Sequence, residues 1–205
     1  LKLMRDGVIR SMAEITDAGI SRMTVKRAVE AEKLIRFNRG HYVSAEIELP
    51  ANLSLASISK SIDGVICLGS AAQMHELGDE DPASIWIAVD RTAYGRSQHR
   101  SIHDPHQIVF WQGNYLTVGV EIRLIAGVQV KVTNPARTVV DLLNARRSLG
   151  EDVGPKALMD YLKSGQPMSE LWSIAENLGV QDDLVPFFRV AEEFREGMTP
   201  APRAS

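Results

Sequence analysis

Residues 8–43, VIRSMAEITDAGISRMTVKRAVEAEKLIRFNRGHYV, decide the fold of the N-terminal part of this chain. They predict a short helix that starts at Ser11, a turn at Gly19, a second helix that starts at Ser21 and a basic hairpin over residues 36–42. This order of elements predicts a winged helix-turn-helix, whose second helix enters the major groove of DNA while the hairpin lies on the backbone.

Capping residues and apolar spacing support both helices. Ser11 and Glu14 have the S-x-x-E spacing of a capping box. Ser21 suits the N-cap of the second helix, and Gly19 suits a turn with a positive φ angle. Apolar residues at three- and four-residue steps are expected to face inward: Met12, Ile15 and Ala18 in the first helix, and Val25, Ala28 and Val29 in the second.

The polar residues that remain outside form the candidate DNA contact. In the second helix we expect base or phosphate contacts from Ser21, Arg22, Thr24, Lys26 and Arg27. In the hairpin we expect phosphate or minor-groove contacts from Arg36, Asn38, Arg39 and His41. Since one such unit reads few bases, binding to inverted repeats of operator DNA is expected, as a dimer or cooperatively. The alternative is a small helical unit whose charges are only solvated.

Charge is distributed unevenly along the chain. Residues 1–42 hold nine Lys and Arg against five Asp and Glu, a net charge of +4, whereas the whole chain carries −3. Residues 43–205 therefore carry −7. This asymmetry indicates a nucleic-acid-binding end joined to an acidic part that could meet a basic protein.

The whole chain has the composition of a soluble globular protein. Of its 205 residues, 44% are hydrophobic and 24% are charged. No apolar run approaches the ~18 residues of a membrane helix, and the N-terminus lacks the pattern of a secretory signal. Cys67 is the only cysteine and stands in an apolar run, so no intramolecular disulfide or cysteine zinc cluster can form. We expect a cytoplasmic protein without membrane contact, in which this thiol is buried.

The fold class is expected to be α+β, with the winged unit over residues 1–46, a mixed α/β domain ending in helices over 52–197, and a frayed tail over 198–205. Residues 46–50 are the expected linker. The second domain is expected to begin with helix over 53–77, followed by buried strands over 84–89 and 108–111. A hairpin over 120–132 precedes a helix that Asn134 caps and Pro135 opens. Three amphipathic helices follow, over 155–163, 169–177 and 182–194.

One run after the hairpin is specific: residues 132–142 spell VTNPARTVVDL. Together with the winged unit, LGSAAQMHELG at 68–78 and WIAV at 86–89, it resembles the AbiEi-type antitoxins of type IV toxin–antitoxin systems, over about residues 5–190. The resemblance implies a protein that binds operator DNA, represses its own promoter and counteracts a nucleotidyltransferase-like toxin, by direct contact or otherwise. It makes Pro135, Arg137, Thr138 and Asp141 the family motif. His41 departs from the usual wing sequence.

Three other groups of residues were weighed for chemistry. Gly69 and Ser70, before a strand that ends at Asp90, are faintly similar to a nucleotidyltransferase site, but Ala88 stands where a second metal-binding acid is needed. His99, His103 and His106 lack regular ligand spacing, which favours a polar loop over a metal site. Arg137 and Asp141, four residues apart, could be functional, or could form an ion pair with a folding role, on the helix surface or buried. We therefore expect no enzyme, metal or cofactor.

Two alternatives stay open at this stage. Arg91, Arg96 and Arg100 flank Tyr94 and Gly95 in an expected exposed loop, which could be a second DNA contact, part of a toxin-facing surface or a solvated hairpin. The protein as a whole could instead be a stand-alone winged-helix regulator whose C-terminal domain senses a ligand or oligomerises. A nucleotidyltransferase-like reading frame immediately downstream would favour the antitoxin.

Overall fold

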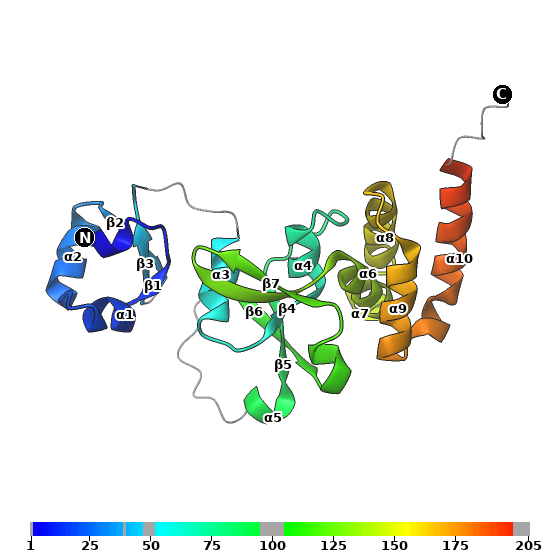
Figure 1. Cartoon of the computed structure of the whole chain (residues 1–205), viewed down its shortest axis with the longest axis horizontal. Helices are drawn as coiled ribbons and strands as arrows, with labels where there is room; N and C mark the ends of the chain where they lie inside the picture. The colour runs from blue at the N-terminus through cyan, green and yellow to red at the C-terminus, as the bar shows by residue number, and fades with distance from the viewer. Residues whose placement is uncertain (1, 39, 47–51, 95–104, 199–205) are drawn as a thin grey trace.

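The computed structural model describes residues 2–38, 40–46, 52–94 and 105–198 (Figure 1). Its N-terminal unit, which ends at Glu46, combines short helices with a three-stranded antiparallel sheet of order β1-β3-β2. The elements are η1 (Lys2–Met4), β1 (Arg10–Ser11), α1 (Met12–Asp17), α2 (Arg22–Glu30), β2 (Leu34–Asn38) and β3 (His41–Ser44).

The small sheet carries apolar side chains on both faces, because successive side chains of a strand point in opposite directions. On one face, Leu34 and Tyr42 pack with Ile15 and Val25 beneath α1 and α2. On the other face, Val43 belongs to a separate cluster that extends into the rest of the protein. Helix α2 therefore lies on the outer side of this sheet, away from the second unit, whereas α1 reaches that unit through Glu14.

The second unit contains a five-stranded mixed sheet of order β6-β5-β4-β8-β7. Strands β5 and β6 run parallel, as do β4 and β8, whereas β4 is antiparallel to β5 and β7 is antiparallel to β8. The strands are β4 (Val65–Ile66), β5 (Ile85–Asp90), β6 (His106–Trp111), β7 (Val120–Ile125) and β8 (Val128–Thr133). The protein is thus of mixed α and β structure.

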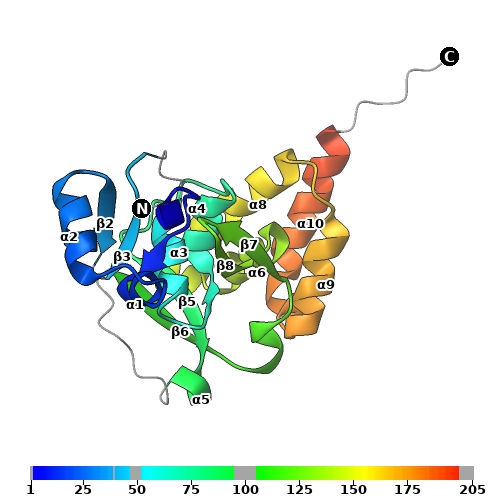
Figure 2. The same ribbon diagram turned by 60° about the vertical axis from the view of Figure 1, so that its left-hand side comes forward.

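Helices cover both faces of this sheet. Figures 1 and 2 agree that α3 and the N-terminal unit lie on one side of it, and α6 with α8, α9 and α10 on the other. Neighbouring residues of β5 accordingly enter different cores, Ile87 on the α3 side and Ala88 on the α6 side. The helices are α3 (Leu53–Ser59), α4 (Leu68–Met74), α5 (Arg91–Tyr94), η2 (Gly113–Leu116), α6 (Pro135–Asn144), α7 (Arg146–Leu149), α8 (Val153–Lys163), α9 (Met168–Leu178) and α10 (Gln181–Met198).

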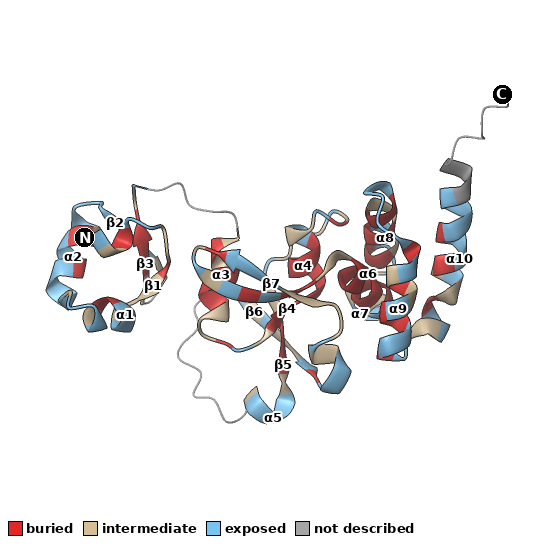
Figure 3. Ribbon diagram, in the orientation of Figure 1, coloured by how far each residue is buried: buried red, intermediate tan, exposed pale blue. Residues whose placement is uncertain are grey.

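Burial is concentrated in α6, which is almost wholly covered by its neighbours (Figure 3). Its N-terminus is fixed by Asn134, whose side chain accepts a hydrogen bond from the backbone N–H of Arg137 at 2.8 Å, with Pro135 in the first turn. The expected capping of this helix is confirmed. The expected burial of Cys67 is confirmed as well, since its exposed fraction is 0%.

The two units share one hydrophobic cluster, to which Ile9 and Val43 contribute from the N-terminal unit and Ile58 and Ile125 from the second. Backbone bonding reinforces the contact, because the N–H of Ile9 donates to the carbonyl of Ala126 at 3.1 Å. The N-terminal unit is therefore seated on α3 and on the β7–β8 turn by packing as well as by the chain connection.

The sequence prediction of helix over residues 53–77 is wrong in its middle. Helix α3 ends at Ser59, and Val65 and Ile66 form β4 at the centre of the sheet before α4 begins at Leu68. β-branched residues favour a strand, and here β5 and β8 supply hydrogen-bonding partners on both sides. Both neighbours are distant in sequence, so local spacing alone does not reveal this strand.

Smaller departures concern the ends of elements. Residues 91–94 form the single turn α5 where an exposed loop was expected, and α7 was not expected at all. Ala18, expected to face inward, is exposed. The β7–β8 hairpin is confirmed, and its turn residues Ala126 and Gly127 both have positive φ angles, as a tight two-residue hairpin turn requires. The expected linker lies mostly, and the frayed tail largely, outside the described residues.

Candidate nucleic-acid interface

The start of each helix in the N-terminal unit is fixed by a serine. The side chain of Ser11 accepts from the N–H of Glu14 at 3.2 Å, and Glu14 Oε2 accepts from the N–H of Ser11 at 2.6 Å, which completes a capping box. Ser21 Oγ accepts from the N–H of Thr24 at 3.1 Å. Gly19 turns the chain between the helices at a φ of +83°. The predicted turn and caps are confirmed.

Helix α2 presents a polar outer face. Val25 and Ala28 are buried beneath it, and Val29 packs partly against the same core. The residues that face outward are all exposed: Ser21, Arg22, Met23, Thr24, Lys26 and Arg27. The first turn holds no acidic side chain, so the partial positive charge of the helix N-terminus adds to the arginine charge.

The cations of this face differ in their surroundings. Lys26 Nζ lies 3.8 Å from Glu30 Oε1, but both side chains are largely exposed, so the pair adds little stability and can open. Within the described parts of the chain, Arg22 and Arg27 form no ion pair. These two arginines are therefore available for an anionic partner.

Arg36 lies on the same side of the sheet as α2. It stands two residues after Leu34 on β2, so both side chains point to the face that α1 and α2 cover, and Arg36 is exposed. Of the two other hairpin candidates, Arg39 and the side chain of Asn38 lie outside the described residues. Arg36 is thus the hairpin cation that the structure places beside the α2 face.

His41 does not lie where the sequence analysis expected it. Because Tyr42 points into the core beneath α1 and α2, strand alternation turns His41 toward the opposite face. There it is half-buried, and its Nδ1 lies 3.5 Å from Ser57 Oγ on α3. His41 therefore belongs to the contact between the two units, a position that does not favour the expected DNA contact.

Glu14 joins α1 to the second unit. Lys60 Nζ donates to both of its carboxylate oxygens at 2.7 Å and to the carbonyl of Ile9 at 3.2 Å. Burial raises the pKa of Glu14, but the bonds from Lys60 and Ser11 outweigh it and lower the pKa to about 2. Lys60 was not singled out in the sequence, since it stands 46 residues from Glu14 and no local pattern marks it.

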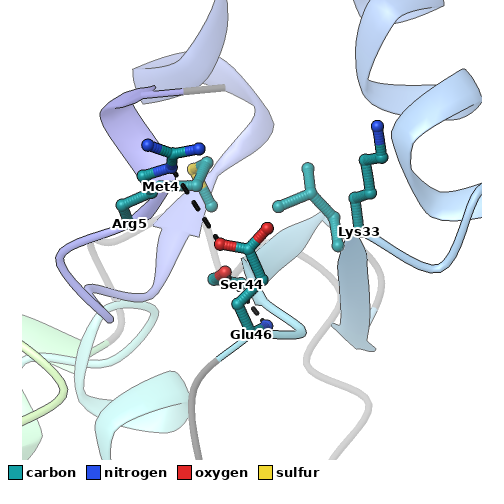
Figure 4. Close-up of a pocket in the computed structure, with 6 residues that line it drawn as sticks. Met4, Arg5, Lys33, Ser44 and Glu46 are labelled. Carbon is teal, nitrogen blue, oxygen red and sulfur yellow. Dashed lines mark hydrogen bonds and ion pairs between the residues drawn. The ribbon is translucent and has the colours of Figure 1, made fainter.

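A small pocket lies on another part of the N-terminal unit (Figure 4). It has a volume of about 130 Å³ and is lined by Met4, Arg5, Lys33, Leu34, Ser44 and Glu46. The guanidinium of Arg5 is 4.0 Å from Glu46, and both side chains are mostly exposed. The pocket holds one carboxylate and no histidine or cysteine, so paired-carboxylate or cysteine–histidine chemistry has no residues to use there.

The motif residues surround the N-terminus of α6. Arg137 is fully buried and donates to Asp141 Oδ1 at 2.8 Å, to the carbonyl of Tyr115 at 3.1 Å and to the carbonyl of Val118. Its guanidinium lies 4.5 Å from the centre of the Trp111 ring. Burial raises the pKa of Asp141 to about 6, although Arg137 acts to lower it.

Thr138 extends this buried network. Its hydroxyl lies 2.8 Å from that of Thr133 and donates to the carbonyl of Asn134 at 2.8 Å. The predicted pairing of Arg137 with Asp141 is confirmed, and of the surface and buried alternatives the structure shows the buried one. Arg137, Thr138 and Asp141 therefore hold η2, the end of β8 and α6 together, and all three are buried.

The residues considered for catalysis have structural partners. Ser70 Oγ accepts from the N–H of Trp86 at 2.9 Å, and Asp90 Oδ1 accepts from the N–H of Thr92 at 2.7 Å. Burial raises the pKa of the Cys67 thiol well above its ordinary value. Across the described ranges, no three His, Cys, Asp or Glu side chains converge as metal ligands. His99 and His103 lie outside those ranges, as do Gly95, Arg96 and Arg100.

A solved structure with a similar α+β fold is that of the RV2827C protein from Mycobacterium tuberculosis, with a TM-score of 0.51 and 15% sequence identity over 85% of this chain and 69% of that one. This likeness concerns the fold alone. No family model and no curated protein matches the sequence. No helix in the described part of the chain is long and apolar enough to span a membrane.

Proposed function

We propose that the N-terminal unit is a winged helix-turn-helix and that the protein is a DNA-binding transcriptional repressor. The observation that carries this proposal is the exposed face of α2, which presents Arg22, Thr24, Lys26 and Arg27 and whose first turn has no acidic side chain. The strand β1, the helices α1 and α2, and the β2–β3 hairpin follow one another in the order that such a unit requires.

The dimensions of α2 suit the major groove. With its side chains an α-helix is about 10–12 Å across, which matches the major-groove width of about 12 Å, and α2 has 9 residues. Arginine donates two parallel hydrogen bonds to guanine, so Arg22 and Arg27 are the base-reading candidates, with Lys26 and Arg36 on phosphates. The second unit lies on the opposite face of the small sheet and leaves this approach open.

The acidic second unit has a separate role in the proposal. On the resemblance of its VTNPARTVVDL run to AbiEi-type antitoxins, the protein counteracts a nucleotidyltransferase-like toxin and represses the promoter of its own operon. Residues 43–205 carry a net charge of −7. This charge repels the DNA backbone and suits contact with a basic protein partner. Arg137 and Asp141 are buried, so they support this role by holding the fold and not by contact.

DNA binding is tested by fluorescence anisotropy on the promoter upstream of the gene and on a scrambled duplex, across a salt series. We expect promoter-specific binding that weakens steeply with salt, because phosphate contacts release counterions. Arg22→Ala/Arg27→Ala should weaken promoter binding at least tenfold. The control Arg147→Ala/Arg189→Ala removes two exposed arginines of the second unit and should change little. Equal affinity for both duplexes would refute the proposal that the protein is a promoter-specific repressor.

Toxin neutralisation is tested separately, by co-expressing the protein with the product of any nucleotidyltransferase-like reading frame beside its gene. The Arg22→Ala/Arg27→Ala variant should still restore growth, because its second unit is intact. If the native protein binds its promoter but fails to restore growth, the antitoxin role is wrong and the DNA-binding role stands.

A further inference from the structure

Strand β7 exposes apolar side chains at the edge of the larger sheet. Ile122 is 62% exposed and Leu124 is 74% exposed, the latter being the most exposed of the large apolar residues described. They alternate with Glu121 and Arg123, so both apolar side chains lie on the face of β7 opposite to the charged ones. β7 pairs with β8 on one side only, so these exposed apolar side chains stand on a strand whose other edge has no neighbour in the sheet.

The strand is also a regular edge strand without a break in its backbone pairing. β7 is the last strand of the order β6-β5-β4-β8-β7, and its six residues pair with β8 in unbroken register. Natural edge strands are commonly blocked by a bulge, a proline or charged side chains. The sequence VEIRLI has no bulge and no proline, and its two charges, Glu121 and Arg123, are opposite in sign, so a second copy can pair with them. The outer edge of β7 is therefore suited to pair with another strand.

The sequence of β7 is complementary to itself in the antiparallel direction. When two copies pair about a two-fold axis at Ile122, that residue meets its own copy and Val120 meets Leu124 of the other chain. Glu121 then lies opposite Arg123 of the other chain, and the reverse pair forms as well. Within one chain, Arg123 Nε already lies 2.7 Å from Glu121 Oε1, so the pairing would gather two acids and two bases on one face.

We propose that β7 pairs antiparallel with β7 of a second copy of this chain, so that one sheet continues across a symmetric dimer. In a two-fold interface the same surface of both subunits meets, so that surface must be complementary to itself. The sequence VEIRL is complementary to itself, because its opposite charges face each other and its apolar residues face apolar residues. The pairing does not depend on DNA binding, although it would bring two α2 helices into one particle.

The other edge of the sheet does not share these properties. On β6, Phe110 is 49% exposed, but Tyr94 packs edge-on against its ring and Arg91 lies 5.5 Å from the ring centre. Its sequence HQIVFW offers no opposed charges to a second copy. The N-terminal unit meets the β7–β8 hairpin at the turn, through Ile9 and Ala126, and leaves Ile122 and Leu124 exposed.

The dimer should be weak and concentration-dependent. Stable interfaces bury about 1,200–2,000 Å², and one short strand pair supplies only part of that area. The test is sedimentation velocity of the full chain without DNA over a wide concentration series. We expect the sedimentation coefficient to rise from the monomer toward the dimer value, and a native chain that stays monomeric throughout would overturn the proposal.

Charge reversal identifies the interface. Glu121→Arg places arginine opposite arginine, and Arg123→Glu places glutamate opposite glutamate, so each variant alone should associate about tenfold more weakly or worse. Mixed together, the two variants are complementary again and should form a heterodimer near native affinity. The control Arg147→Glu, an exposed site on α7, should associate like the native chain. Native-like association of either single variant, or a mixture that fails to associate, would refute pairing through β7.

Discussion

Replacing Arg137 should cost the protein much of its stability. The side chain is fully buried, bonds to Asp141 and two backbone carbonyls, and stacks on Trp111. In Arg137→Met, Asp141 remains in the core without its cation. Breaking a buried pair on one side costs about 3–5 kcal/mol, and each carbonyl left unpaired adds roughly 1 kcal/mol.

Part of this cost is relieved by protonation. The pKa of Asp141 is already raised to about 6 by burial, and losing Arg137 raises it further, so the carboxyl becomes neutral at pH 7. We therefore expect a loss of about 4 kcal/mol, which is a large share of the 5–15 kcal/mol that stabilises a typical domain. The measurement is urea denaturation at pH 7, followed by circular dichroism, with the midpoint and slope compared between variants.

Two further variants separate the ion pair from simple loss of packing. The double variant Arg137→Met/Asp141→Leu removes both charges and should lose less stability than Arg137→Met alone. Arg147→Ala removes an exposed arginine and should stay within about 0.5 kcal/mol of the native protein. A loss below about 1 kcal/mol for Arg137→Met would show that the buried network does not hold the fold as argued.

Three other predictions concern neighbouring features. Gly119→Ala should destabilise the protein more than Gly113→Ala does. Both glycines have positive φ angles, but only at Gly119 would the new Cβ meet the Arg137 side chain, at 2.6 Å. Equal melting temperatures of the two variants would refute this. As the pH falls from 7 to 5, Asp141 takes up a proton in the folded chain before it does in the unfolded chain. Its contribution to the free energy of unfolding should therefore rise by roughly 1 kcal/mol over this range. Denaturation curves of Asp141→Asn should lack that rise. Lys60→Met should free Glu14 and raise the carboxyl pKa from about 2 toward its ordinary value, as NMR titration would report, and an unchanged pKa would contradict the contact.

Local signals in the sequence predicted the local structure well. The serine caps, the Gly19 turn and the Asn134–Pro135 helix start depend on residues a few positions apart, and each is confirmed. The same holds for the β7–β8 hairpin, whose alternating pattern and turn lie within one short segment. The outward face of α2 followed from helical spacing alone, and all of its residues are exposed.

Long-range contacts explain what the sequence did not reveal. β4 is a strand only because β5 and β8 flank it, and both lie far along the chain. His41 turns toward α3 because its neighbour Tyr42 occupies the core, a choice that the hairpin sequence alone leaves open. The stacking of Arg137 on Trp111 and the bond from Lys60 to Glu14 likewise join distant residues.

The seating of the N-terminal unit limits how freely it could be exchanged. Ile9 is bonded to Ala126 through its N–H and to Lys60 through its carbonyl, and Glu14 serves both the start of α1 and the ion pair with α3. A chimera that carried another N-terminal unit on this C-terminal half would have to transplant these residues along with α1 and α2. The two units are therefore expected to co-evolve, and neither is expected to be exchanged by itself.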